Sequence, residues 1–459
     1  MAVRAPLFAR VVSIALPLVL QQLVFQIQAL INQAFLGNLN PLYLSVVANC
    51  TFPFFATATL LWALGTGVTI LVSQNRGAGR KEEALRSVEG SLLFLSLIGV
   101  LFFAVWMLFP SPLLSLLGVR GSVLVEGIPF ITILSFLFLL IGLEAGAGGY
   151  LQGIGRTRPL FVSGAIKAGL NVLLDWLLIF GNLGFPRLGL VGAAVATVAS
   201  TVIADAYLLF AILRPSADGW GLRLAQIAKP SLRVFRKVAS LGVPASVESF
   251  LWFVGMLAIL RMLNGIDALA AGMFSLVFLI EVVPAMMYDS VGRATTTLIG
   301  EQTGMGNRDG AREVGWACLR YVFILSGGVA VVFLVFPKDI LGLFTRDRAV
   351  VEATALYLSI AAFTLFPRSG NIVIGSSIRG LGDTPWMLLT QIFGTIFVVA
   401  LAATLVIAAR LGLVGIFIAL GADEAIRFGM NGLRFGKGRP KALAGFFPVR
   451  SDETPARSG

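Results

Sequence analysis

Twelve apolar runs of helix length constrain the fold of this chain more than any other feature. A helix needs roughly 20 consecutive, mostly apolar residues to cross a bilayer. Runs of that kind lie near residues 11–36, 45–74, 88–109, 124–152, 160–181, 189–213, 239–263, 268–299, 315–336, 350–378, 386–409 and 411–430. Only 13% of the 459 residues are charged, against about 25% in an average soluble domain. We therefore predict an all-α integral membrane protein with twelve transmembrane helices, since an outer-membrane barrel would show short alternating strands.

Basic residues gather in every second loop, and this asymmetry predicts the topology. The segments Arg76–Arg86 and Arg214–Lys237 and the tail from Lys437 onward are rich in Lys and Arg, whereas the intervening loops hold few. Cytoplasmic loops carry such an excess of basic residues, so both termini are expected in the cytoplasm. The net charge of +12 then reflects topology, and no nucleic-acid partner is expected.

The chain also repeats itself with an offset of 227 residues. Three anchors recur at this distance, namely Pro17 with Pro244, Gly77/Gly79 with Gly304/Gly306, and Gly153/Gly155 with Gly380/Gly382. Each half holds six spans, so the halves share one orientation and are related by a pseudo-two-fold axis along the membrane normal. The polar stretch 214–237 reads as the linker between them. We predict a six-helix lobe over 1–225, a second over 226–436 and a disordered cytoplasmic tail over 437–459.

Several longer motifs resemble the MATE family (multidrug and toxic compound extrusion). They are GTGVTILVSQNRGAG at 65–79, GYLQGIGRTRP at 149–159, NVLLDWLLIFG at 171–181, LGLVGAAVATVAS at 188–200 and ADEAIRFGMNGLRFGKGR at 422–439. The resemblance covers nearly the whole chain. It implies two six-helix bundles that form a V, alternating access, and ion-coupled export of cationic amphiphiles across the cytoplasmic membrane of a bacterium or archaeon. It also implies that the first half binds the coupling ion.

The run Leu160–Gly181 carries a carboxylate at membrane depth. Lys167, Asn171 and Asp175 are spaced i, i+4, i+8 and therefore share one helical face. An aspartate inside the bilayer costs about 2.5 kcal/mol or more and rarely faces lipid. This face is expected to border a wet cavity or a polar partner helix, with Lys167 snorkelling to the cytoplasmic surface.

The resemblance implies an ion site that joins Asn171 and Asp175 to an Asp on the first helix and a Thr on the sixth. Asn32 and Thr197 stand at those positions here. Helix rise agrees, because it puts Asn32, Asp175 and Thr197 about 6, 9 and 12 Å below the outer helix ends. Asn and Thr alone would be explained by hydrogen bonds between packed helices, but Asp175 would not.

The missing first-helix Asp leaves this site with one negative charge fewer. That weakens the case for tight Na⁺ binding. We expect Asp175 to be the proton carrier, and Na⁺ held by Asp175 and Asn171 is the alternative.

The first helix carries amides on two sides. Gln21, Gln28 and Asn32 fall within about 40° of one another at 100° per residue. Gln22 and Gln26 lie about 120° round the helix. Lipid cannot satisfy so many amides, so this helix is expected to border the substrate cavity.

The second half adds acids beside an aromatic ring. Glu248 lies one turn after Pro244, and Glu281 shares a face of the eighth span with Tyr288. Charge pairing and cation–π attraction, worth about 2 kcal/mol when desolvated, would suit a cationic amphiphile. Arg368 lies within the tenth span, and buried charges are usually paired. The sequence leaves open whether Arg368 lines an open cavity with these acids or neutralises Glu248 or Glu281.

No catalytic or ATP-binding motif accompanies the spans. The chain has no G-x-x-x-x-G-K-[ST] loop, no G-x-S-x-G elbow, no histidine and no paired Asp-x-x-Asp of a prenyl-group transferase, so neither an enzyme nor a cofactor beyond the coupling ion is expected. The predicted function is multidrug efflux by antiport of cationic amphiphiles against H⁺ or Na⁺. The alternative is a flippase for a lipid-linked or anionic amphiphile, with Arg293 and Arg368 as its cavity cations. The expected partners are these small molecules and the bilayer, and the chain is expected to act as a monomer.

Overall fold

The computed structural model describes residues 6–116, 118–215, 219–266 and 268–437. The predicted tail beyond Lys437 lies outside the described residues. The helices within these ranges are α1 (Leu7–Leu39), α2 (Pro41–Gly77), α3 (Lys81–Leu108), α4 (Pro110–Leu116), α5 (Gly121–Leu134), α6 (Leu137–Gly153), α7 (Arg158–Leu178), η1 (Asn182–Gly184), α8 (Leu190–Leu213), α9 (Leu224–Ile227), α10 (Leu232–Ile266), α11 (Ala268–Gly304), α12 (Arg308–Val335), α13 (Pro337–Gly342), α14 (Arg348–Gly380), α15 (Thr384–Ala403), η2 (Thr404–Ala408) and α16 (Gly412–Lys437).

Every predicted span corresponds to a helix, with two departures. Among the described residues, ten helices are long and apolar enough to cross a membrane, and α5 with α6 forms a bent eleventh. The bend of 46° interrupts the predicted straight span 124–152. The twelfth predicted span, α16, is not among them, because it carries Asp423, Glu424 and Arg427. Asp423 and Arg427 are buried, so these charges do not face lipid.

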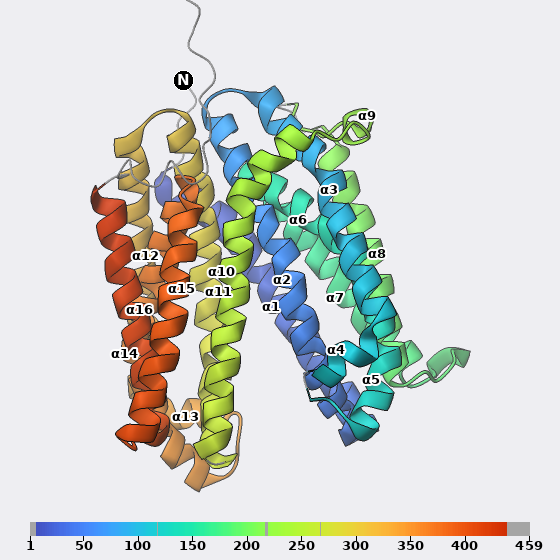
Figure 1. The fold of residues 1–459 in the computed structure, drawn as a ribbon, viewed down its shortest axis with the longest axis vertical. Helices are drawn as coiled ribbons and strands as arrows, with labels where there is room; N and C mark the ends of the chain where they lie inside the picture. Colours follow the sequence, from blue (N-terminus) through green and yellow to red (C-terminus); the bar gives the residue numbers. More distant parts are fainter. Residues whose placement is uncertain (1–5, 117, 216–218, 267, 438–459) are drawn as a thin grey trace, which may run out of the picture.

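The helices form two lobes that lie side by side (Figure 1). The first lobe comprises α1 to α8 and the second α10 to α16, and α9 lies on the connection between them. Helix α10 starts at Leu232, inside the polar stretch 214–237 and ahead of the predicted span 239–263. Helix α9 lies at one end of the molecule, which we call the linker end. The confirmed architecture is therefore two helical bundles in one membrane protein.

Repeated glycines turn the chain at equivalent places in the two lobes. Gly79 and Gly306 follow α2 and α11 with φ of 73° and 72°, and Gly155 and Gly382 follow α6 and α14 with φ of 71° and 85°. Positive φ is strained for residues with a Cβ, so glycine is needed at each turn. The 227-residue repeat thus marks a repeated structure.

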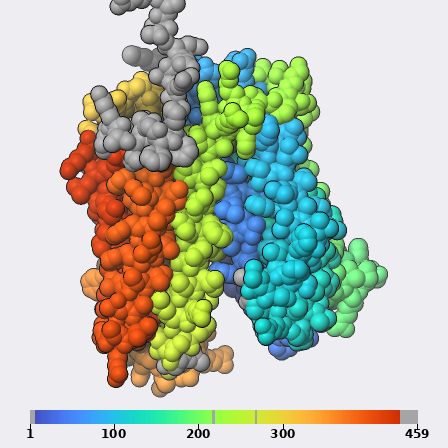
Figure 2. All heavy atoms as spheres, viewed as in Figure 1, coloured from blue at the N-terminus to red at the C-terminus, as the bar shows by residue number. Residues whose placement is uncertain are grey.

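The lobes touch along α1, α2, α10 and α11. Near the linker end, Arg10 Nη2 lies 2.6 Å from Glu301 Oε2 across the interface. A Cβ on Gly77 would overlap the backbone of Glu301, so α2 and α11 meet backbone to backbone. At the opposite end the space-filling view shows a hollow between α10 and the first lobe (Figure 2). The two lobes therefore form a V that opens away from the linker end.

Candidate functional site

Side chains from α1, α7 and α8 meet in a buried polar cluster of the first lobe. The Asn171 amide lies 2.6 Å from Gln28 Nε2 and 3.2 Å from Thr197 Oγ1. With its nitrogen turned toward Asp175, this amide donates to Asp175 Oδ2 at 3.0 Å and lies 3.2 Å from the Asn32 amide. The structure thus brings together the four residues expected at the ion site and adds Gln28 to them.

The Asp175 carboxyl is closed off in this conformation. Its side chain is 0% exposed, so it faces neither lipid nor water directly. Its Oδ1 has no hydrogen-bond partner, and none of the ion pairs within the described part of the chain includes it. A buried carboxyl in such surroundings is stable only when protonated or when a cation neutralises it.

A cavity of about 720 Å³ lies between the lobes. Its walls come from α1, α2, α6, α7 and α8 on one side and from α10, α11 and α14 on the other. It is lined by all four glutamines expected there, Gln21, Gln22, Gln26 and Gln28. Asp175 does not line it, but Gln28 both lines it and contacts Asn171. The amides of Gln28 and Asn171 therefore lie between the cavity and the buried carboxyl.

Most charges that line this cavity are paired. Lys167 Nζ lies 3.4 Å from Glu144 Oε1, and Arg293 Nε lies 2.8 Å from Asp289 Oδ2. The expectation that Lys167 snorkels to the membrane surface is wrong, because Glu144 on α6 draws its ammonium into the cavity. Asp205 also lines the cavity, but it forms no ion pair with any described residue.

The second lobe resolves the open question about Arg368. Its Nη1 donates to Glu281 Oε2 at 2.9 Å, whereas Glu248 pairs with Arg379 of α14. Glu248 lines the central cavity, but Glu281 and Arg368 line a separate pocket of about 80 Å³ inside the second lobe. Tyr288 is fully buried and packs in the hydrophobic core. The prediction of one substrate cavity holding all four residues is therefore wrong, because α14 supplies a separate arginine to each acid.

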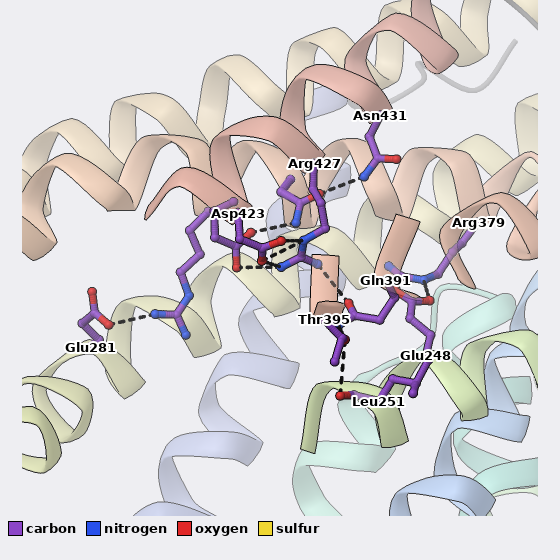
Figure 3. A network of polar contacts seen from close by, with 12 residues as sticks. Glu248, Leu251, Glu281, Arg379, Gln391, Thr395, Asp423, Arg427 and Asn431 are labelled. Atoms are coloured by element: carbon purple, nitrogen blue, oxygen red, sulfur yellow. Dashed lines mark hydrogen bonds and ion pairs between the residues drawn. The ribbon is translucent and has the colours of Figure 1, made fainter. Parts of the chain in front are cut away.

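A wider polar network ties α14, α15 and α16 together (Figure 3). Arg427 on α16 donates to Asp423 Oδ2 at 2.6 Å and to Gln391 Oε1 of α15 at 2.9 Å. Asn371 of α14 donates to Glu424 Oε2 at 2.7 Å. These contacts satisfy polar groups that lipid could not. The network explains how so polar a helix as α16 packs within a membrane protein.

Sequence reasoning left the cavity charges Glu144, Asp205 and Arg379 without a role. The sequence does mark Glu144 and Asp205 as candidates, since an acid within a membrane span often has a functional role. Arg379 lies in the last turn of α14, where a basic residue is also expected from the topology alone. Whether each of these charges meets a partner depends on how helices pack, which no local pattern shows.

Comparison with known proteins agrees with this architecture. The MatE family model matches the chain twice, at residues 17–177 and 244–404, and these matches are displaced by the same 227 residues as the glycine anchors. A probable multidrug resistance protein NorM of Thermotoga maritima is 27% identical over 441 residues, which cover 93% of this chain and 92% of that one.

Two solved structures share the fold. One is an outward-facing conformation of a multidrug resistance MATE family transporter of the MOP superfamily, with a TM-score of 0.84 and 21% identity over 93% of this chain and 96% of that one. The other is a MOP superfamily transporter from Pyrococcus furiosus, described as having a binding pocket of reverse polarity, with a TM-score of 0.86 and 20% identity over 95% and 98% of the two chains. With the family model matched in both halves, this chain belongs to the MatE family of membrane transporters.

Proposed function

We propose that this chain is a multidrug efflux antiporter of a prokaryotic cytoplasmic membrane, with both termini in the cytoplasm. It exports cationic amphiphilic compounds in exchange for H⁺, with Na⁺ as the alternative coupling ion. The names of its relatives support multidrug export. The excess of basic residues at the linker end supports the orientation.

One observation carries the proposal, namely the buried Asp175 carboxyl, which is separated from the central cavity by the amides of Asn171 and Gln28. Antiport needs a group whose occupancy by the ion differs between the two access states. Asp175 meets this need, because no arginine or lysine of the described chain pairs with it, so the ion itself must neutralise its charge. A single carboxyl with amide and hydroxyl neighbours favours a proton over a tightly held Na⁺.

The flippase alternative receives less support from the cavity. An anionic head group would need a free cation, but Arg293 is paired with Asp289 and Arg368 with Glu281. The alternative keeps a test of its own. Binding of a cationic dye to the purified protein that is weakened by anionic lipid head groups would favour it.

The decisive experiment is dye efflux from proteoliposomes under an imposed ΔpH and, separately, an imposed ΔNa⁺. We expect ΔpH to drive efflux in the unchanged protein. Asp175→Asn should reduce the driven rate to that measured without a gradient, because its amide carries no proton. Expression and elution of the variant should stay unchanged, since the substitution keeps the shape of the side chain.

Glu126→Gln is the matched control, an acid of the same lobe that lines neither cavity. It should transport at the unchanged rate. Gradient-driven transport by Asp175→Asn at the full rate would remove Asp175 from the mechanism. A rate that follows ΔNa⁺ and ignores ΔpH would replace H⁺ by Na⁺ as the coupling ion.

A further inference from the structure

We propose that Asp205 is the anchor for the protonated amine of the exported compound, in a site distinct from the Asp175 cluster. The inference rests on the proposed export function and names the chemical class of its substrate. It is built from α6, α7 and α8, which supply Glu144, Lys167 and Asp205 to one wall of the central cavity.

Asp205 is the carboxyl of this wall with unused bonding capacity. Its side chain is only 3% exposed, yet it lines the cavity. Its buried Oδ2 accepts no hydrogen bond from any described group. Buried polar atoms are nearly always satisfied, so an unpaired carboxyl oxygen in a residue that lines a cavity suits a donor supplied by a ligand.

The neighbouring Glu144 contrasts with Asp205 because both its oxygens are engaged. Its Oε2 accepts from Trp62 Nε1 at 2.9 Å, and its Oε1 lies 3.4 Å from Lys167 Nζ. Glu144 and Lys167 are the charged groups that act on the Asp205 carboxyl. Lys167 forms its ion pair with Glu144, and no described cation lies within ion-pair distance of Asp205, although the Lys167 ammonium still acts on it from farther away.

The charge balance of the three groups points to a cation. Two carboxylates and one ammonium leave one negative charge when all are ionised, so one further positive charge would neutralise the wall. The free Oδ2 of Asp205 calls for an N–H donor rather than a quaternary ammonium, which has none. The exposed ring of Trp62, beside Glu144, offers an aromatic face to the body of such a compound. The structure thereby assigns this wall to aromatic compounds that carry a protonated amine.

The site and the ion cluster share α7. Lys167 lies one turn before Asn171 and two turns before Asp175 on the same face. Asp175 does not line the cavity, and Asp205 does. The amine and the coupling ion therefore occupy different carboxyls, and a substitution at one leaves the other intact.

Equilibrium binding of quinacrine to the purified full-length protein tests the inference. Quinacrine is a fluorescent acridine with a protonated tertiary amine at neutral pH. We expect Asp205→Asn to weaken binding roughly 10-fold or more, the usual loss for one charge-assisted hydrogen bond. A derivative of quinacrine methylated to a quaternary ammonium should bind the unchanged protein more weakly than quinacrine itself.

Lys167→Gln is the second variant, and it is expected to change the affinity for quinacrine in the opposite direction. Removing the Lys167 ammonium leaves the carboxylates of Glu144 and Asp205 with no positive charge between them, so the cationic quinacrine should bind more tightly. A purely structural role for Lys167 would lower stability without tightening binding. This variant also decides the question if Asp205→Asn does not fold.

Asp175→Asn separates the inference from the proposed function. It should bind quinacrine within about two-fold of the unchanged protein while losing gradient-driven efflux. Equal binding by Asp205→Asn and the unchanged protein, or no binding of quinacrine by the unchanged protein, would overturn the inference. Either result would leave the efflux test of Asp175 standing.

Discussion

At the scale of single residues, the buried acids differ in whether a cation lies beside them. The first lobe holds Asp175 among amides and a hydroxyl, with no cation. The second lobe pairs its acids with arginines, as in Glu281 with Arg368 and Glu248 with Arg379. A neutralised pair has little reason to take up an ion, whereas a lone carboxyl does. The lobe with the unpaired acid is therefore the one expected to respond to the gradient.

Arg427 illustrates what the paired charges do for stability. It contacts Asp423, Glu424 and Gln391 and is buried. Arg427→Met would leave two carboxyls without their cation, and we expect a loss of about 3–5 kcal/mol in the free energy of unfolding. The measurement is the thermal unfolding midpoint of the detergent-solubilised protein.

Arg346→Met is the control for this prediction, since Arg346 is an exposed residue in the loop between α13 and α14. Its midpoint should match that of the unchanged protein. Equal midpoints for Arg427→Met and Arg346→Met would show that the network contributes nothing to stability.

At the scale of helices, small residues decide how closely neighbours pack. In α6, a Cβ on Gly149 would lie 2.5 Å from the carbonyl oxygen of Gly65 in α2 and 2.8 Å from Cβ of Val68. The adjacent Gly148 has no atom within 4 Å of its Cβ position. The α2–α6 contact therefore requires glycine at position 149, whereas position 148 has room for a side chain.

This difference predicts opposite effects for two neighbouring substitutions. Gly149→Ala should destabilise the protein by about 1–3 kcal/mol, because the added methyl group forces two backbones apart. Gly148→Ala should be neutral or stabilising by up to about 1 kcal/mol, since alanine favours the helix. Melting of the two variants under identical conditions compares them directly, and equal loss in both would contradict the packing argument.

At the scale of the whole molecule, the repeat supplies the architecture and the differences between its copies supply the function. At the 227-residue offset, Asn171 and Asp175 correspond to Val398 and Ala402. The second lobe therefore keeps the backbone of the first without its ion cluster. One lobe can respond to the ion while the other serves as the partner against which it moves.

The contact between the lobes at the linker end is the part that must break in the opposite access state. Arg10 and Glu301 join α1 to α11 there, with side chains 30% and 15% exposed. Glu301→Gln should favour opening of this end by about 1 kcal/mol, roughly a five-fold change in the ratio of populations. Spin labels at Arg80→Cys and Arg308→Cys, beside the two equivalent glycine turns, should then report a larger share of long distances.

Cys50 and Cys318 are buried and need not be replaced for this labelling. Glu313→Gln, an exposed acid on α12, should leave the distances unchanged. The same distribution in Glu301→Gln and the unchanged protein would mean that the ion pair does not hold the linker end closed.

Local patterns in the sequence determined the class of fold, the order of the helices and the two-fold repeat. Helical spacing also placed Lys167, Asn171 and Asp175 on one face, and helix rise placed Asn32 and Thr197 at a matching depth. These predictions hold because face and depth depend only on the geometry of one helix in a bilayer.

Only the tertiary structure decided which charges meet. It assigned Arg368 to Glu281 and Arg379 to Glu248, turned Lys167 into the cavity and left Asp205 without an ion pair to any described residue. It also broke the fourth span into α5 and α6. Such choices depend on how neighbouring helices rotate and approach, and packing between distant segments sets that rotation, which the period of a single helix does not contain.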